Sequence, residues 1–510
     1  MVVDASAIVP NEEYDEVDDF LSKQDGKIVR TGTGQMCRHR PQQKCSHCLP
    51  IDPYDEAYLK DKEIKHMSFH AYVRKLTDVH GRGTHLKQPL ENIDCKLDLT
   101  CTNHRPYPHG ICTKCRPSTV SLNRQVYRHV DNITIENEDV VNKFLDFWRA
   151  SNHQRVGYLI GRYEPFADVP LGIKAVVTAI YEPPQSSSDS FVKFEESDPN
   201  ESVVDKLCSF LGMKRLGWIF TDLWSSDPTA GTVHCTRHKE SFLLTAKECI
   251  TAGAFQSKYK NKTPYCSDGT FGSKFVTLVA SGDESKHINF SGYQVSNQCS
   301  ALVEADILCP TSHPELAWVR EKPLHEKHYI TDVQYTEKNE FGAEVLKNGR
   351  PMPVEYLLVD VPAGMPKDPC TSFHVTNPAK AFPIENRELI GKAQDIRSVA
   401  NYVLDFSNNQ FLELISNFHF LLYLLTNEML KFSEEEVKEL ARFVTEHSRE
   451  GAADWAEKSP NWATFIELMK SHEGQSADLS APSQAWSCKH CTFENTEPRE
   501  ECAVCGLPNA

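Results

Sequence analysis

The sequence predicts an α+β protein of several domains, with zinc-binding modules near both ends. Ten cysteines and two histidines fall into three clusters that have the spacing of metal ligands. Between these clusters, segments with helical and with strand-like periodicity alternate along the chain. Of the 510 residues, 40% are hydrophobic and 25% are charged, which is ordinary for globular domains. A chain of this length is expected to fold into more than one domain.

The charge of the chain limits its partners. The formal net charge is -16, whereas proteins that bind nucleic acid usually present a basic surface, so we expect no direct contact with nucleic acid. The N-terminus, MVVDASAIVPNEEYDEVDDF, has no basic region and no apolar core of signal-peptide length. The cysteines are therefore expected to be reduced. The most apolar stretch, 411–430, is interrupted by polar residues, which predicts a buried helix and no membrane insertion.

The C-terminal cluster has the strongest metal-binding pattern. Cys488-x2-Cys491 is followed by Cys502-x2-Cys505, and each short spacing places two sulfurs on one face of a tight turn, as tetrahedral zinc requires. About twenty residues cannot bury enough apolar area to fold alone, so zinc must supply the folding free energy. The alternatives are four unrelated cysteines or a pair of disulfides, and disulfides need an oxidising compartment.

Residues 27–121 contain two more clusters and are predicted to form two zinc-finger modules. Each cluster offers three thiolates and one imidazole: Cys37, His39, Cys45 and Cys48 in the first, and Cys101, His104, Cys112 and Cys115 in the second. His47 and His109 lie close to these residues, and Cys95 could replace one thiolate, so the complete ligand sets stay open. Neither cluster leaves an open metal position beside a base, which favours structural zinc. The sequence therefore predicts three structural zinc ions.

Composition divides the rest of the chain. Residues 1–26 are acidic and are predicted to form a disordered arm. Residues 122–300 are predicted to be one α/β domain, with an amphipathic helix at Val140–Ser151. Strands are expected at the runs rich in β-branched and aromatic residues: 156–161, 173–181, 215–223 and 274–281.

A second domain is predicted over residues 301–470. It begins with strand-like sequence that includes 354–361, and it is helical from about residue 385. Residues 471–484 are polar and small, which is typical of a flexible linker. The linker makes 485–510 a separate module.

That C-terminal module resembles the NZF zinc finger. Its residues match the pattern W-x-C-x2-C-x3-N-x6-C-x2-C at Trp486, Cys488, Cys491, Asn495, Cys502 and Cys505. In that family, a Thr-Phe pair and an apolar residue before the fourth cysteine contact the apolar patch of ubiquitin, and these places hold Thr492, Phe493 and Val504. An aromatic side chain that so small a module cannot bury suits a partner's apolar surface, although Phe493 could instead cover the zinc turn. The many glutamates make RNA binding the weaker alternative.

The middle of the chain resembles the MPN domain, whose active members hold a catalytic zinc. The stretches RVGYLIG, GWIFTD and LLTAKECITAG are similar to it in order and spacing. Here the two places of the metal-binding histidines hold Phe220 and Asp222, the place of the acid/base glutamate holds Gln154, and Glu248 stands where an aspartate ligand would be. Phe cannot bind zinc and an amide cannot transfer a proton, so we expect a catalytically dead domain. The alternative is a metalloprotease that acts on ubiquitin chains.

From about Phe20 onward the chain resembles the nuclear protein localization protein 4 homologues. Similar stretches include KHMSFHAYVRKL (65–76), GICTKC (110–115), GWIFTDL (217–223) and PIENRELIG (383–391). The resemblance implies an adaptor and not an enzyme. Such an adaptor pairs with ubiquitin fusion degradation protein 1 and recruits polyubiquitinated proteins to the hexameric AAA+ ATPase valosin-containing protein. It also implies a place in cytoplasm and nucleus, and at the ER membrane through partners. Family members begin with a ubiquitin-like domain that docks on the ATPase. This chain is expected to lack that domain, and the sequence leaves open whether its binding to the ATPase is weaker.

Overall fold

The computed structural model describes residues 14–30, 45, 48–78, 86, 88–227, 231–373, 381–427 and 429–473, and the backbone of 486–487 and 494–495. The chain divides into two compact units. The first unit contains Met1–Phe373 and Glu385–Gly391, and the second contains His374–Ile384 and Lys392–Ala510.

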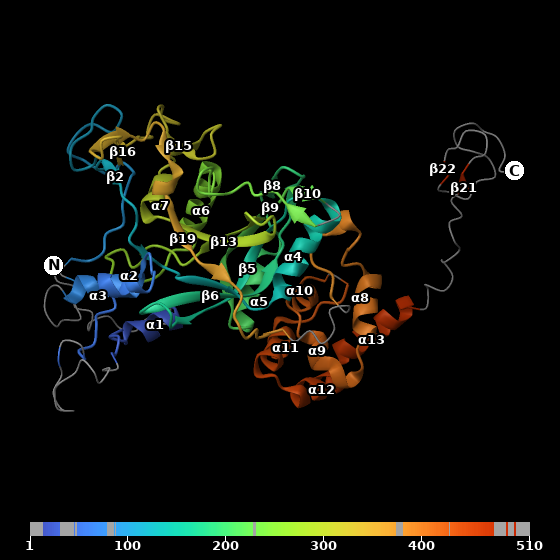
Figure 1. The fold of residues 1–510 in the computed structure, drawn as a ribbon. Helices are drawn as coiled ribbons and strands as arrows, with labels where there is room; N and C mark the ends of the chain where they lie inside the picture. The colour runs from blue at the N-terminus through green and yellow to red at the C-terminus, as the bar shows by residue number, and fades with distance from the viewer. Residues whose placement is uncertain are drawn as a thin grey trace. The chain divides into compact units, whose positions relative to one another are not determined.

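A mixed sheet of eight strands lies at the centre of the first unit, in the order β19-β13-β12-β9-β5-β6-β4-β20 (Figure 1). In chain order its strands are β4 (Asn132–Ile135), β5 (Val156–Phe166), β6 (Gly172–Tyr181), β9 (Lys214–Asp222), β12 (Val276–Gly282), β13 (Ile288–Val295), β19 (Leu358–Val361) and β20 (Ala363–Gly364). β5 pairs antiparallel with β6 and β9, whereas β9 and β12 run parallel. β19 and β20 are the two outermost strands of this order, and only Pro362 separates them in the sequence. The two edges of the sheet therefore come together at this residue.

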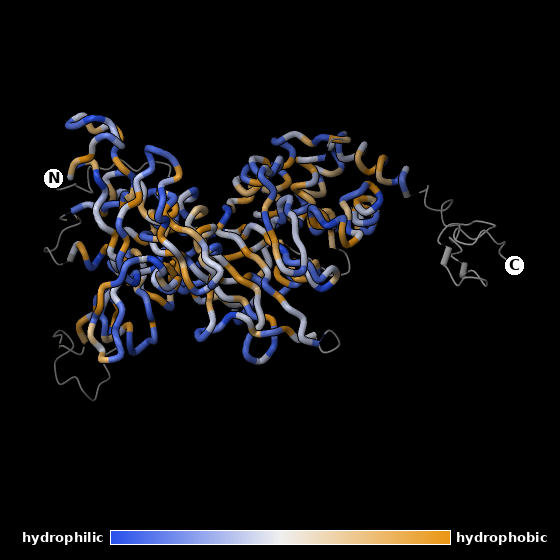
Figure 2. Tube along the Cα trace, turned by 90° about the horizontal axis from the view of Figure 1, so that it is seen from above, coloured by the Kyte–Doolittle hydropathy of each residue, from blue (hydrophilic) through white to orange (hydrophobic). Residues whose placement is uncertain are grey.

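The sequence explains why these strands form the core. β12 is buried at every residue, and β6 is buried at nearly every residue, as expected for near-continuous apolar runs covered on both faces. Ile133, Leu159, Ile219 and Leu278 all belong to one buried cluster. A Cβ on Gly217 would lie 2.2 Å from the carbonyl oxygen of Val276, so glycine permits the close approach of β9 and β12. In Figure 2, white and orange segments lie together in the interior of the first unit, and blue segments are common at its edges.

Four helices of the first unit accompany this sheet: α4 (Glu138–Ser151), α5 (Glu201–Phe210), α6 (Ala246–Lys258) and α7 (Asn297–Glu304). The helix predicted at 140–151 is confirmed as α4. It begins two residues earlier because the side chain of Asn137 accepts a hydrogen bond from the backbone N–H of Val140, and it ends at Asn152 in the left-handed conformation.

The strands predicted at 173–181, 215–223 and 274–281 are present with ends shifted by one or two residues, and β5 continues five residues past its predicted end at 161. A further predicted strand is only partly present. Residues 354–361 were predicted to form a single strand, but Val354–Tyr356 forms a 3-10 helix and only Leu358–Val361 is extended. The buried Leu357 separates the two elements. The sheet also reaches past residue 300, where the sequence predicted a domain boundary, because β19 and β20 supply its outer strands.

The N-terminal arm differs most from its prediction. Residues 14–26 do not form a disordered arm, because Glu16–Ser22 forms the helix α1, whose Val17 and Leu21 are buried in the core of the sheet. Asp18 accepts a hydrogen bond from Nε2 of His70, 2.9 Å away, and forms an ion pair with the buried Lys274. These partners lie 52 and 256 residues away, so local charge could not reveal them.

Smaller elements complete the first unit. They are α2 (Glu56–Asp61), β1 (Met67–Ser68), α3 (Phe69–Asp78), β2 (Val120–Leu122), β3 (Tyr127–Arg128), β7 (Gln185–Ser187), β8 (Val192–Phe194), β10 (Ser225–Asp227), β11 (Thr232–Val233), β14 (Leu308–Pro310), β15 (Leu316–Val319), β16 (Val333–Lys338), β17 (Glu344–Asn348), β18 (Met352–Pro353) and the 3-10 turn Glu388–Ile390. β2 pairs with β16, which ties the segment after the second zinc cluster to the chain beyond residue 330.

The second unit is helical. It contains α8 (Ile396–Leu404), α9 (Phe411–Ile415), α10 (Phe418–Thr426), α11 (Glu434–Glu446), α12 (Arg449–Lys458) and α13 (Pro460–Glu473). The single buried helix predicted at 411–430 is instead two helices, because Asn417 adopts an extended conformation and its side chain caps α10. Among the described residues, none of the helices has the length and apolar character needed to cross a bilayer.

Candidate functional site

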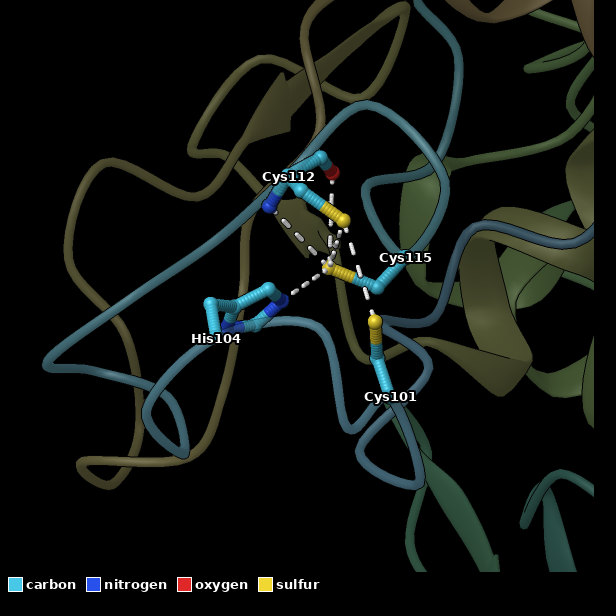
Figure 3. Close-up of side chains that lie close together, drawn as sticks. All are labelled: Cys101, His104, Cys112 and Cys115. Atoms are coloured by element: carbon cyan, nitrogen blue, oxygen red, sulfur yellow. Dashed lines mark hydrogen bonds between the residues drawn. The ribbon is translucent and has the colours of Figure 1, made fainter.

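The second zinc cluster is the clearest candidate site in the described chain. The ligand atoms of Cys101, His104, Cys112 and Cys115 all lie within 4.8 Å of one another (Figure 3). Cys101 and His104 come from the first limb of a long loop, and the Cys112–Cys115 turn forms the second limb. In that turn the backbone N–H of Arg116 donates to the carbonyl oxygen of Cys112, 3.0 Å away.

The distances between these atoms fit tetrahedral zinc. The Sγ atom of Cys112 lies 3.7 Å from the Sγ of Cys101 and 3.8 Å from the Sγ of Cys115. Zinc bound by sulfur at 2.3 Å in a tetrahedron separates two sulfurs by about 3.8 Å. Nε2 of His104 is the fourth ligand atom and lies 3.1 Å from the Sγ of Cys115. The four residues would therefore hold one zinc ion as a structural site.

Neighbouring backbone groups prepare these ligands for metal. Nδ1 of His104 lies 2.7 Å from the carbonyl oxygen of Arg105, which leaves Nε2 as the free ligand atom. The backbone N–H groups of Cys115 and Lys114 lower the pKa of the Cys112 thiol to about 7, which favours the thiolate that zinc binds. A Cβ on Gly110 would lie 2.8 Å from the same Arg105 oxygen, so this loop requires glycine.

Of the three residues that the sequence left open as ligands, two are not part of this cluster, and His47 lies outside the described residues. His109 is not among the residues whose ligand atoms converge, and neither is Cys95. Cys95 is buried, and burial raises the pKa of its thiol to about 12. A thiol of that kind behaves as a small apolar side chain.

The first cluster is described only in part. The Sγ atoms of Cys45 and Cys48 lie 3.6 Å apart, and the backbone N–H groups of Cys48 and Leu49 both donate to the carbonyl oxygen of Cys45. This turn has the shape of one half of a zinc site. Cys37 and His39 lie outside the described residues.

The C-terminal module is described only through the backbone pairing of β21 (Trp486–Ser487) with β22 (Glu494–Asn495). Outside the described residues lie its predicted ligands and ubiquitin contacts: Cys488, Cys491, Cys502, Cys505, Thr492, Phe493 and Val504. Their roles stay predictions.

The position that the MPN resemblance assigns to the acid/base residue holds a fully engaged amide. Gln154 is 3% exposed. Its Nε2 donates to the carbonyl oxygens of Asp189 and Leu223, at 2.7 and 2.9 Å. Its Oε1 accepts from the hydroxyl of Thr221 and from the backbone N–H of Leu223. Gln154 therefore joins the end of β9 to the turn between β7 and β8.

The other three positions surround a guanidinium. Arg237 donates from Nε to Asp222 at 2.7 Å, and from both Nη atoms to Glu248 at 2.8 and 2.7 Å. The centre of its guanidinium lies 5.4 Å from the centre of the Phe220 ring. Burial by itself lowers the pKa of Arg237, but the bonds to Glu248 and Asp222 raise it above its usual value. Sequence reasoning missed Arg237, because no local pattern marks it.

Comparison with known sequences places the chain in a family. The sequence model of the NPL4 family matches residues 155–470, which is more than half of the chain. The chain belongs to the NPL4 family. A second model, for the zinc-binding region of the NPL4 family, matches residues 12–152 and so contains both N-terminal clusters. Together with the geometry of Cys101, His104, Cys112 and Cys115, this match supports zinc binding in this part of the chain.

Relatives in the NPL4 family align with nearly the whole chain. It is 55% identical over 522 residues to nuclear protein localization protein 4 homolog 1 of Caenorhabditis elegans, which covers 98% of both proteins. It is 46% identical over 514 residues to the Homo sapiens homolog, covering 98% of this chain and 83% of that protein. It is 42% identical over 517 residues to the Drosophila melanogaster homolog, covering 97% and 78%. The resemblance to this family is confirmed.

Proposed function

We propose that this member of the NPL4 family is an adaptor that binds polyubiquitinated proteins. Together with ubiquitin fusion degradation protein 1, it delivers them to the hexameric AAA+ ATPase valosin-containing protein. The clients are then extracted and degraded by the proteasome, including those of ER-associated degradation. The adaptor works in the cytoplasm and nucleus, and at the ER membrane through its partners. Family membership supports this proposal.

The surroundings of Arg237 are the single observation that most favours an adaptor over a hydrolase. Hydrolysis by an MPN-type site needs a metal ion, imidazole ligands and a base that takes a proton from metal-bound water. Here Phe220 offers no ligand atom, and Arg237 already engages the carboxylates of Asp222 and Glu248. Both the Nε2 and the Oε1 atom of Gln154 already take part in hydrogen bonds. This arrangement supports a domain that binds without catalysis.

Zinc has a structural role in the proposal. Three zinc ions hold the two N-terminal modules and the C-terminal NZF finger, and the finger of about twenty residues is too small to have a core of its own. The NZF finger contacts ubiquitin through Thr492, Phe493 and Val504. A surface of this size binds weakly, so the linker 471–484 matters, since tethering raises the effective concentration of the finger along a ubiquitin chain.

The test is capture of polyubiquitin by the full chain with Phe493→Ala. We expect the variant to capture long ubiquitin chains more weakly than the wild type does. We also expect it to bind monoubiquitin more weakly, because the finger no longer contributes to binding. Phe341→Ala is the matched control, because Phe341 is 91% exposed in the first unit and belongs to a different surface. Equal capture by the wild type and Phe493→Ala would place the ubiquitin contact elsewhere. Zinc content measured on the same samples shows whether the finger remains folded.

The rival function is a metalloprotease that cleaves ubiquitin chains. Incubating the pure protein with added zinc and with chains of several linkages separates the two functions. We expect the chains to keep their length. Cleavage of the ubiquitin chains that a chelator abolishes would contradict the proposal that this protein is an adaptor without protease activity.

A further inference from the structure

Arg237 lies at the meeting point of three separate elements. It belongs to the loop 234–244, Asp222 ends β9, and Glu248 lies in the first turn of α6. The Arg237 side chain is 6% exposed. Its Nη1 also donates to the carbonyl oxygen of Leu243, 3.0 Å away. The guanidinium therefore also links Arg237 to a second residue of its own loop. One guanidinium therefore connects the loop, the strand and the helix.

The groups around this guanidinium form a nearly complete binding site. Glu248 accepts in a fork from both Nη atoms, which is the geometry that favours arginine over lysine. Aromatic rings lie near its face: the centre of the Phe242 ring is 5.2 Å away, on a residue of the same loop. The carboxylates are held independently of Arg237. Asp222 accepts from Nε1 of Trp224 at 2.9 Å, and Glu248 accepts from the backbone N–H of Thr245 at 2.8 Å.

We propose that Arg237 is the built-in cation of this site and does the structural work that a bound metal does in other proteins. Its guanidinium neutralises the paired carboxylates and fastens the loop 234–244 over the end of β9. The site is thus a guanidinium-binding site whose ligand is covalently part of the chain. This role of Arg237 in the domain does not depend on ubiquitin binding by the finger at residues 485–510.

The test is chemical rescue of Arg237→Ala in the full chain. We expect the backbone of residues 231–244 to exchange hydrogen about tenfold faster than in the wild type, because the loop loses its attachment. Millimolar guanidinium chloride, far below denaturing concentrations, should slow this exchange again by filling the vacated site. The wild type should show no response.

Two further variants separate the effect of the forked hydrogen bonds from the effect of removing any arginine. Arg149→Ala is the matched control, since Arg149 is an exposed arginine that pairs with Asp146 on α4, and it should neither speed loop exchange nor respond to guanidinium. Arg237→Lys keeps a charge but not the fork, so it should exchange faster than the wild type and respond little. Wild-type exchange rates in both Arg237 variants, or equal slowing by guanidinium in the Arg149 control, would overturn the proposal.

Discussion

The guanidinium of Arg387 and the carboxylate of Glu182 form an ion pair in which the side chains are 3% and 0% exposed. Nε of Arg387 lies 3.0 Å from Oε2 of Glu182, and Nε of Arg155 lies 2.7 Å from the same oxygen. Burial by itself raises the pKa of Glu182, but the two arginines lower it below its usual value. The pair fixes the segment Glu385–Gly391 to the first unit.

Glu182→Gln should strongly destabilise the first unit. The substitution keeps the shape of the side chain but leaves the buried guanidinium groups of Arg155 and Arg387 without a countercharge, which costs about 3–5 kcal/mol. Chemical denaturation followed by fluorescence measures the loss. Glu196→Gln, at an exposed position, is the control and should change the free energy of unfolding very little. Equal stability of the two variants would mean that the buried pair contributes nothing.

Asp18→Asn should release α1 from the sheet. The carboxylate holds Lys274 and His70, and those partners keep its pKa below the usual range although burial raises it. Losing a hydrogen bond to a charged group costs about 2 kcal/mol. Faster hydrogen exchange and proteolysis of residues 16–22 measure the release. Asp19→Asn, one residue away and exposed, should behave as the wild type. If both variants resemble the wild type, the ion pairs do not hold the helix.

Cys112→Ser should remove one zinc ion and unfold the loop around it. Zinc supplies most of the folding free energy of such a loop, and a hydroxyl is a poor zinc ligand. Metal analysis should find about three zinc ions in the wild type and about two in the variant. Cys370→Ser, at an exposed single cysteine, is the control and should keep all of them. Unchanged zinc content in Cys112→Ser would contradict the assigned site.

Asp131→Asn should stabilise the protein increasingly as the pH rises. Asp131 is 1% exposed, and burial raises its pKa from 3.8 to about 7. Between these values the folded protein holds a proton that the unfolded chain has lost, so stability falls as the pH increases. The advantage of Asp131→Asn in melting temperature should therefore grow from pH 4 to 7 and stay constant above. Asp168→Asn, at an exposed position, should show no such trend. A constant advantage would mean that Asp131 does not titrate as proposed.

Local sequence patterns predicted the features that depend on neighbouring residues. The spacing of Cys112 and Cys115 implies a turn that places two sulfurs together, and the structure has that turn. The strands β5, β6, β9 and β12 were predictable because their apolar runs can only be buried inside a sheet.

Features that depend on distant residues were not predictable in this way. Its neighbours in sequence predict that Asp18 belongs to a solvated acidic arm. In the structure, Lys274 lies beside it although it is 256 residues away in the sequence. Arg237 carries no signal in its own loop, because its role comes from Asp222 and Glu248 on other elements. Residues 411–430 have the composition of one helix, but the side chain of Asn417 caps a new helix and divides the segment.

We propose that this chain couples polyubiquitin to an ATPase without cutting the ubiquitin chain. The most direct test measures how much hexameric ATPase is retained on beads that carry polyubiquitin. The beads are incubated with ubiquitin fusion degradation protein 1 and the ATPase, with or without this protein. We expect the beads to retain the ATPase only when this protein is added, and we expect the ubiquitin chains to keep their length. Equal retention of the ATPase without this protein, or shortened ubiquitin chains in its presence, would show that the chain does not act as a non-cleaving adaptor.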